Sequence, residues 1–125
     1  MRLLLDSHIL IWLMAGDARL KAEARDAISG AMEVFASTAS IWELAIKVSL
    51  GKLHLDIARL ASLLDVAGIH ELQIARQHVM AVASLPLLHR DPFDRLLVAQ
   101  AITEPMHLLT ADARLAAYSE LVVAV

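Results

Sequence analysis

The feature that most restricts the fold of this chain is an alternation of short apolar segments with longer segments of helical pattern. The short segments predict strands at Arg2–Leu5, Glu33–Ala36, Ile69–Ile74, Met106–Thr110 and Leu121–Val125. The third segment alternates only in part between apolar and polar residues, so it is the weakest of the set. Strands separated by helices form βαβ units, whose strands are parallel and whose helices cover both faces of the sheet. The pattern therefore predicts an α/β fold, a three-layer α/β/α sandwich around a parallel sheet of about five strands.

Glycine and proline residues separate the helical segments, as they commonly do between elements of structure. Helices are predicted at His8–Ala15, Ala18–Met32, from Ser37 or Thr38 to about Leu50, Ile57–Ala67, Ala75–Ser84, Pro92–Glu104 and Asp112–Tyr118. Asp17 is the predicted N-cap of the second helix, and Gly51 the predicted end of the third. No repeat, linker or low-complexity tract interrupts the pattern, which predicts a single domain over residues 1–125.

Composition excludes several classes of protein. Apolar residues make up 58% of the chain, which excludes intrinsic disorder. With no cysteine, the chain forms neither a disulfide nor a thiolate zinc site. The longest stretch without Asp, Glu, Lys or Arg is Gln77–His89, which is shorter than the roughly 20 residues that cross a bilayer. Asp6 interrupts the apolar start that a signal peptide needs, so we expect a cytoplasmic protein with no membrane segment.

Four carboxylates lie where a parallel sheet collects its functional groups. Asp6 directly follows the first predicted strand, and Asp112 lies just beyond the fourth. Glu43 lies on a largely apolar helix, and Asp94 near the start of another. Ligands of such sheets bind beyond the carboxyl ends of the strands. The positions of Asp6 and Asp112 therefore predict that these acids face a common site.

These acids also have purely structural interpretations. Asp6 would cap the turn that follows it, and Glu43 would form an exposed i, i+4 ion pair with Lys47. Thr110 and Asp112 have the pattern of a helix cap followed by an acid in the first turn. Taken one at a time, the residues do not decide between these interpretations and a site.

Asp91 and Asp94 lie at one helix start and need separate roles. Asp91 fits the N-cap, Pro92 fits the first helical position, and Asp94 falls in the first turn. An N-cap side chain folds back onto the first backbone amides, whereas an acid in the first turn can project away from them. We therefore predict that Asp91 is the helix cap and that Asp94 belongs to the site.

Converging carboxylates repel one another, and a divalent cation relieves that repulsion. Oxygen ligands suit Mg²⁺ or Mn²⁺. Such a centre supports hydrolysis of phosphodiester bonds, because the metal activates water and neutralises the phosphoryl oxygens.

Four segments together resemble the PIN-domain ribonucleases, in particular the VapC-type toxins of toxin–antitoxin modules. The segments are Leu3–His8, Ser40–Lys47 with Gly51–Leu53, His89–Ala101, and Leu108–Asp112. The most specific are Trp-Glu-Leu-Ala-Ile-Lys in the second and Asp-Pro-Phe-Asp-Arg in the third. Their order and spacing span nearly the whole chain.

The resemblance implies a strand order of 3-2-1-4-5 and one site per chain. It places Asp6, Glu43, Asp94 and Asp112 around Mg²⁺ or Mn²⁺, and it implies supporting hydroxyl groups at Ser7 and Thr110. It further implies a metal-dependent endoribonuclease that dimerises and is inhibited by a cognate antitoxin of a type II module. It assigns no role to His8, whose simplest interpretation is a packing histidine.

Contact with RNA must depend on few residues, because the formal charge is −3. Basic residues near the acidic motifs are Lys47, Arg90, Arg95 and Arg114, of which Lys47 and Arg95 are the main predicted RNA contacts. Aromatic residues make up 4% of the chain, which leaves little for base stacking. Trp42 and Phe93 are predicted to lie in the core.

Two alternatives belong to other classes of protein. A phosphoacceptor receiver domain would need adjacent acids after the first strand and a lysine after the fifth, but Ser7 follows Asp6 and no lysine follows Lys52. A catalytically inactive PIN-like interaction scaffold would have lost some of the acids, whereas all four are present here.

Overall fold

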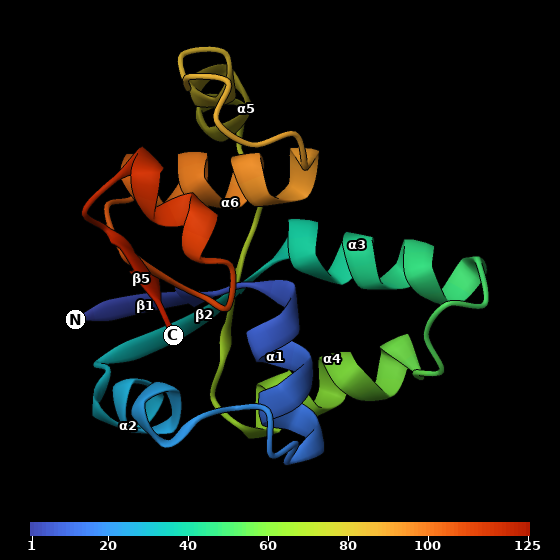
Figure 1. Cartoon of the computed structure of the whole chain (residues 1–125). Coiled ribbons are helices and arrows are strands. Elements are labelled where there is room, and N and C mark those ends of the chain that lie inside the picture. The colour runs from blue at the N-terminus through green and yellow to red at the C-terminus, as the bar shows by residue number, and fades with distance from the viewer.

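The computed structural model describes all 125 residues and contains one parallel sheet. Its strands are β1 (Arg2–Leu5), β2 (Glu33–Ser37), β3 (His70–Leu72), β4 (His107–Thr110) and β5 (Val122–Ala124). The order across the sheet is β3-β2-β1-β4-β5, so β1 lies at the centre (Figure 1). In the register, Leu5 of β1 is opposite Ala36 of β2 on one side and Leu109 of β4 on the other. The predicted fold class and strand order are confirmed.

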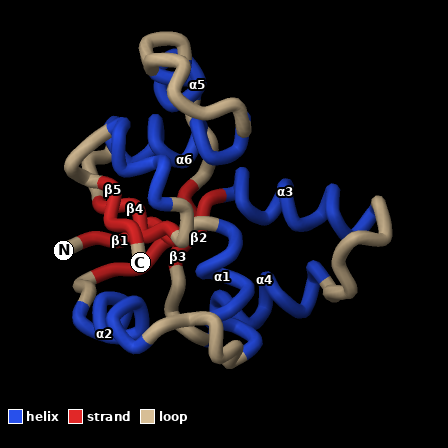
Figure 2. Tube along the Cα trace, viewed as in Figure 1, coloured by secondary structure: helices blue, strands red, loops and turns tan.

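Helices connect the strands and cover both faces of the sheet (Figure 2). They are α1 (Ser7–Ala15), α2 (Ala22–Gly30), α3 (Thr38–Ser49), α4 (Ile57–Val66), α5 (Arg76–Val82), α6 (Pro92–Thr103) and the 3₁₀ helix η1 (Ala113–Tyr118). Side chains of α1, α2 and α4 pack on one face, and those of α6 and η1 on the other. The helix α3 continues outward from the carboxyl end of β2 (Figure 1). None of the helices combines the length and the apolar character that crossing a membrane requires.

The central strand β1 contributes to both cores. Leu3 and Leu5 are fully buried in the core shared with α1, α2 and α4, whereas Leu4 is fully buried in the core shared with α6 and η1. Successive residues of a strand point to opposite faces, so a strand covered on both sides needs an unbroken apolar run. The buried run of β1 thus fixes the position of the residue that follows it, Asp6.

The second helix is shorter than predicted, and Asp17 is not its cap. The helix α2 begins at Ala22 with Lys21 at the N-cap position, and the preceding residues form turns. Oδ1 of Asp17 accepts a hydrogen bond from the backbone N–H of Arg19 at 2.9 Å, and Asp17 Oδ2 lies 2.7 Å from the Arg19 guanidinium. Such a local side-chain bond competes with helix formation. The turn buries Leu20 against the core.

The other elements differ from prediction mainly at their ends. Of the two predicted caps of α3, Ser37 is the one used, with its hydroxyl accepting from the Ala39 N–H at 3.0 Å. The helix ends before Gly51, as predicted, and Gly51 has a φ of 71°, which favours glycine. The segment after Asp112 is a 3₁₀ helix rather than an α-helix.

Trp42 does not lie in the core. Its side chain is 54% exposed, and its ring meets that of Phe93 edge to face with centroids 5.0 Å apart. Both rings line an apolar cleft of about 230 Å³ between α3, α5 and α6, together with Val79, Val82 and Leu96. The apolar pattern of α3 is wider than the stripe that the core covers, so Trp42 remains at the surface.

Candidate metal centre

Asp6 lies at the carboxyl edge of the sheet, where the ends of β1 and β4 meet. Its Oδ1 accepts a hydrogen bond from the Ile9 N–H at 2.8 Å, which makes it the N-cap of α1. Its Oδ2 accepts from the Thr110 hydroxyl at 2.5 Å and from the Ala111 N–H at 3.2 Å. Burial raises the pKa of Asp6, although these hydrogen bonds act to lower it. The carboxylate is therefore rigidly held at a cost in desolvation.

Glu43 is brought to the same edge by α3. Its Oε1 accepts a hydrogen bond from the Ser7 hydroxyl at 2.9 Å, and its Oε2 lies 3.4 Å from Nζ of Lys47. The i, i+4 pair therefore forms, but Glu43 is only 8% exposed, so it is not the solvated surface pair that the spacing allowed. The Ser7 hydroxyl and the Lys47 ammonium group thus fix a mostly buried carboxylate.

Asp94 lies in the first turn of α6, with its side chain 20% exposed. No hydrogen bond reaches its carboxylate, and the closest nitrogen of a basic side chain, His89 Nε2, is 3.9 Å away. Burial is the main cause that raises its pKa to about 7, and the nearby charges of Asp91, Glu43 and Asp6 raise it further. Asp94 is therefore a carboxylate that the chain itself does not neutralise.

Asp112 follows β4 and is paired with a guanidinium group. Arg114 donates from Nε to Oδ1 at 3.0 Å and from its terminal nitrogen to Oδ2 at 2.9 Å. These bonds hold the pKa of Asp112 well below its usual range. Asp112 also caps η1 through the Arg114 N–H. The cap of this helix is therefore Asp112 and not Thr110, and this capping role is compatible with the predicted place of Asp112 in the site.

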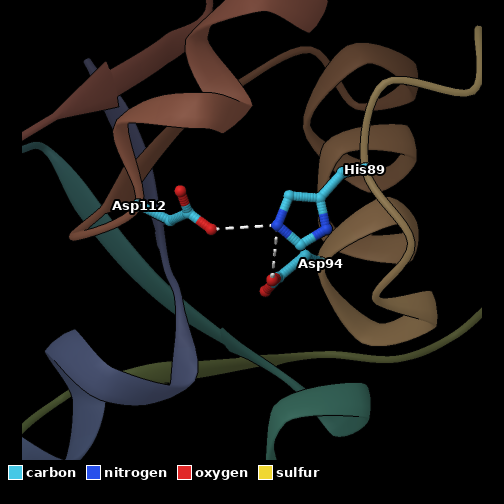
Figure 3. A group of neighbouring side chains, drawn as sticks. All are labelled: His89, Asp94 and Asp112. Atoms are coloured by element: carbon cyan, nitrogen blue, oxygen red, sulfur yellow. Dashed lines mark hydrogen bonds and ion pairs between the residues drawn. The ribbon is translucent and has the colours of Figure 1, made fainter.

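His89 joins Asp94 to Asp112, and sequence reasoning did not assign it a role. Its Nε2 lies 3.0 Å from Oδ2 of Asp112 and 3.9 Å from Oδ2 of Asp94, as Figure 3 shows. Its Nδ1 accepts a hydrogen bond from the backbone N–H of Asp91 at 3.0 Å. Because Nδ1 is an acceptor, the ring proton is on Nε2 and points at Asp112. His89 is therefore a donor to a site carboxylate, and this tautomer leaves Nε2 no lone pair for a metal.

Asp91 caps α6, and it does not share the environment of Asp94. Its Oδ1 accepts hydrogen bonds from the backbone N–H groups of Phe93 at 2.8 Å and of Asp94 at 3.1 Å. Pro92 occupies the first helical position. The carboxylate of Asp91 is thus directed to the helix start, while its own N–H orients His89.

Arg95, a predicted contact with RNA, makes its hydrogen bonds within the chain. Its guanidinium donates to the carbonyl oxygens of Pro86 at 2.9 Å and Val82 at 3.3 Å, and to the Tyr118 hydroxyl at 3.0 Å. Tyr118 Oη in turn accepts from the backbone N–H of His89 at 2.9 Å. Arg95 and Tyr118 therefore fasten the loop that carries His89.

Of the other basic residues named above, two form ion pairs with site carboxylates and one does not. Lys47 and Arg114 each pair with one site carboxylate, while Arg90 is exposed beside the start of α6. His8, which had no predicted role, is exposed on α1 with its ring 5.9 Å from that of Trp12.

The donor set fits a hard divalent cation. Asp6, Glu43 and Asp94 lie close enough for their charges to raise the pKa of Asp94, and Asp94 has no donor of its own. One ligand atom each of His89, Asp94 and Asp112 lie within 4.8 Å of one another, but the tautomer of His89 leaves only carboxylate oxygens as ligands. Oxygen donors favour Mg²⁺ or Mn²⁺ over softer metals.

Comparison with known proteins agrees with this geometry. The family model of the PIN domain matches residues 3–121. The chain is 34% identical over 114 residues to Ribonuclease VapC22 of Mycobacterium tuberculosis, a match that covers 90% of this chain and 88% of that protein.

Solved structures share the fold at lower sequence identity. A chain of VapBC2 from Rickettsia felis, solved with a DNA fragment from its promoter, has a TM-score of 0.72 and 15% identity, covering 100% of this chain and 98% of that one. A toxin–antitoxin complex from Klebsiella pneumoniae gives a TM-score of 0.67 at 18% identity, with 97% and 95% covered. VapBC-1 from nontypeable Haemophilus influenzae gives 0.66 at 17% identity, with 99% and 98% covered.

Proposed function

This chain belongs to the PIN-domain family, as a ribonuclease of the VapC toxin type, and on that premise we propose that it cleaves RNA with Mg²⁺ or Mn²⁺ held by Asp6, Glu43, Asp94 and Asp112. Membership of this family removes the receiver-domain alternative. It makes the protein an endoribonuclease toxin, a hydrolase of phosphodiester bonds. We propose that it acts in the cytoplasm, where its RNA substrate is present.

The observation that carries the metal proposal is the state of Asp94. A mostly buried carboxylate without a hydrogen-bond donor, facing the charges of Asp91, Glu43 and Asp6, is unfavourable in the chain alone. A bound divalent cation supplies the missing counter-charge. The environment of Asp94 thus supports the proposal that the site holds a divalent cation.

The residues around the cation have separable tasks. A divalent metal bound here would activate water and neutralise the phosphoryl oxygens. The Thr110 hydroxyl orients Asp6, and the Ser7 hydroxyl and Lys47 orient Glu43. Preorganised ligands cost little rearrangement when the transition state forms.

Asp112 would complete the ligand set from the β4 side. Arg114 and the Nε2–H of His89 hold its carboxylate facing Asp94. Arg114 also places a positive charge at the mouth of the site, where the negative charge of a phosphodiester would arrive.

A decisive experiment compares cleavage of a mixed RNA pool by the wild type and Asp6→Asn, in Mg²⁺, Mn²⁺ and EDTA. Asparagine keeps the size of the side chain and removes the charge, so we expect folded protein with little cleavage. Wild-type cleavage that persists in EDTA would contradict metal dependence. A folded wild type that cleaves no RNA with either metal would instead favour the inactive interaction scaffold.

A cognate antitoxin and a second copy of the chain are the proposed protein partners. The similar solved structures are toxin–antitoxin complexes, which supports an antitoxin partner. Self-association is supported by the apolar cleft with exposed Trp42 and Val79, because monomeric proteins seldom expose large apolar patches.

Sedimentation of the wild type and of Val79→Lys tests the second copy. We expect the wild type to be a dimer at tens of micromolar and the variant to shift toward monomer. A monomeric wild type under these conditions would contradict self-association.

A further inference from the structure

An open cleft of about 520 Å³ adjoins the metal centre on the side of Asp112 (for the surrounding elements, see Figure 1). Its walls come from three parts of the chain: the exposed face of α1, the turn before α2, and the start of η1. The lining residues are His8, Trp12, Arg19, Ala111, Asp112, Ala113 and Arg114. Its volume falls in the range of pockets that hold small ligands, roughly 300–1,000 Å³. Asp112 is thus shared between the cleft and the metal centre.

One wall of the cleft is formed by the Trp12 ring and the Arg19 guanidinium group, which is held in place by Asp17. The Arg19 guanidinium carbon lies 5.4 Å from the centroid of the Trp12 ring, a cation–π distance. Asp17 fixes Arg19 there through contacts to Nε at 3.2 Å and to a terminal nitrogen at 2.7 Å. The His8 ring lies one helical turn from Trp12, with centroids 5.9 Å apart. Asp17, Arg19 and His8 therefore all contribute to the surface around the Trp12 ring.

The opposite wall carries the positive charge of Arg114, next to the candidate metal centre. Arg114 is strongly exposed while its guanidinium contacts Asp112, so it reaches the cleft and the metal centre together. The side chains of Ala111 and Ala113 are small and leave the floor open. A flat cationic–aromatic surface facing an arginine suits a ligand with a planar base and a phosphate.

We infer that this cleft binds one unpaired nucleotide of the RNA next to the scissile phosphate. Its base lies against the Trp12–Arg19 surface, and the phosphate that links it to the cut contacts Arg114. The base must be unpaired, because a base in a duplex has no free face to stack. This inference rests on the proposed ribonuclease function and adds to it which part of the substrate is recognised.

The first experiment measures kcat and KM with a single-stranded RNA of mixed sequence. Trp12→Leu removes the aromatic face but keeps an apolar side chain against the core, and Arg19→Gln alters only the surface. We expect each to raise KM about tenfold, the effect of losing one stacked base, with a much smaller change in kcat. Arg76→Gln is the matched control, since Arg76 is exposed and lies outside the cleft. Melting temperatures show whether Trp12→Leu is folded. If it is not, the KM of Arg19→Gln tests the inference.

The second experiment locates the contact on the RNA. An abasic nucleotide is moved along a fluorescein-labelled oligonucleotide, and anisotropy reports binding to Asp94→Asn protein with and without Trp12→Leu. At one position next to the cut, we expect the abasic site to weaken binding about tenfold when Trp12 is present and hardly at all with Trp12→Leu. Abasic effects that are the same in both proteins at every position would overturn the inference.

The outcomes separate this inference from the proposed function. Normal cleavage with unchanged KM in Trp12→Leu and Arg19→Gln would overturn the cleft and leave the ribonuclease intact. Binding that depends on Trp12, without any cleavage by the wild type, would support the cleft and contradict the catalytic proposal. Weaker binding of a co-purified antitoxin by these variants, with unchanged RNA kinetics, would overturn the inference by assigning the cleft to a protein.

Discussion

The site carboxylates have the same chemistry but opposite electrostatic environments. Burial and neighbouring acids raise the pKa of Asp94 to about 7, whereas the bonds from Arg114 hold the pKa of Asp112 well below its usual range. The chain therefore supplies Asp112 with a counter-charge and leaves Asp94 without one. We therefore expect a bound cation to stabilise the ionised form of Asp94 more than that of Asp112. Substitutions of Asp94 should then affect cleavage and folding stability differently.

Asp91 and Asp94 should give opposite results when each is replaced. Asp91→Ala loses the α6 cap and should cost about 1 kcal/mol of unfolding free energy, while the folded fraction keeps substantial cleavage. Asp91→Asn should be mild, because asparagine also caps helices. Asp94→Asn should keep or gain stability and lose cleavage by more than the roughly 10–100-fold that loss of an outer-shell partner costs.

Thermal melts and RNA cleavage on these variants test the assignment. If Asp91→Asn is folded and as inactive as Asp94→Asn, both acids belong to the metal site and Asp91 is more than a cap.

His89 should matter through the hydrogen bond that it donates to Asp112. His89→Ala should weaken Mn²⁺ binding by about 10–100-fold, whereas His89→Gln, whose amide can still donate, should retain more of it. Calorimetric titration with Mn²⁺ gives the affinity without reference to activity. His54→Ala is the control, because His54 is exposed and outside the site. Equal Mn²⁺ affinity in His89→Ala and the wild type would contradict this role.

At the scale of elements, the residues that hold the loop between α5 and α6 in place also position His89 of the candidate site. Arg95 and Tyr118 hold this loop, and the same hydroxyl of Tyr118 binds the backbone of His89. The geometry of the metal centre therefore depends on a contact between α6 and η1. Sequence spacing gives no sign of this contact, because the partners come from three separate segments.

Arg95→Met should lower the stability of the fold without changing the electrostatics of RNA binding. Methionine keeps the apolar stem but loses hydrogen bonds of a charged donor, worth about 1.5–3 kcal/mol each. A phosphate contact would make the slope of log Kd against log salt fall by about one unit when it is lost. We expect an unchanged slope for Arg95→Met and a reduced slope for Arg114→Gln, measured in Asp94→Asn protein. A reduced slope for Arg95→Met would restore its predicted contact with RNA.

Rules about elements predicted some parts of this structure and missed others. The acids Asp6 and Asp112 were predictable, because the carboxyl ends of parallel strands meet at one edge. The turn at Asp17 was missed, since a side-chain bond to Arg19 overrode helix propensity. The role of His89 was missed because it depends on how a loop is held against Tyr118. Sequence patterns thus predict residues placed by strands better than those placed by loops.

At the scale of the whole molecule, we expect the proposed metal centre to make folding stability depend on pH and on the cation together. Asp94 and Asp6 have raised pKa values in the folded chain, so the folded state binds more protons than the unfolded state between about pH 4 and pH 7. Stability should therefore fall as pH rises through this window, by up to about 4 kcal/mol for Asp94. The lowered pKa of Asp112 acts in the opposite sense, but only below this window.

Unfolding in EDTA at pH 5 and at pH 7.5 measures this dependence. We expect a lower melting temperature at pH 7.5, a smaller difference in Asp94→Asn, and recovery at pH 7.5 when Mn²⁺ is added, because the ion binds the folded state. Equal melting temperatures at the two pH values would show that Asp94 is neutralised by some other group.

The central position of β1 has a consequence for how the toxin is made. Asp6 directly follows β1, but its hydroxyl partner Thr110 is the last residue of β4 and the proposed ligand Asp112 follows that strand, so six helices and two other strands separate them along the chain. A growing chain holds the first carboxylate long before it holds the last. The proposed metal centre therefore cannot assemble until β4 has been synthesised and has paired with β1, so a partly made chain lacks the complete nuclease site.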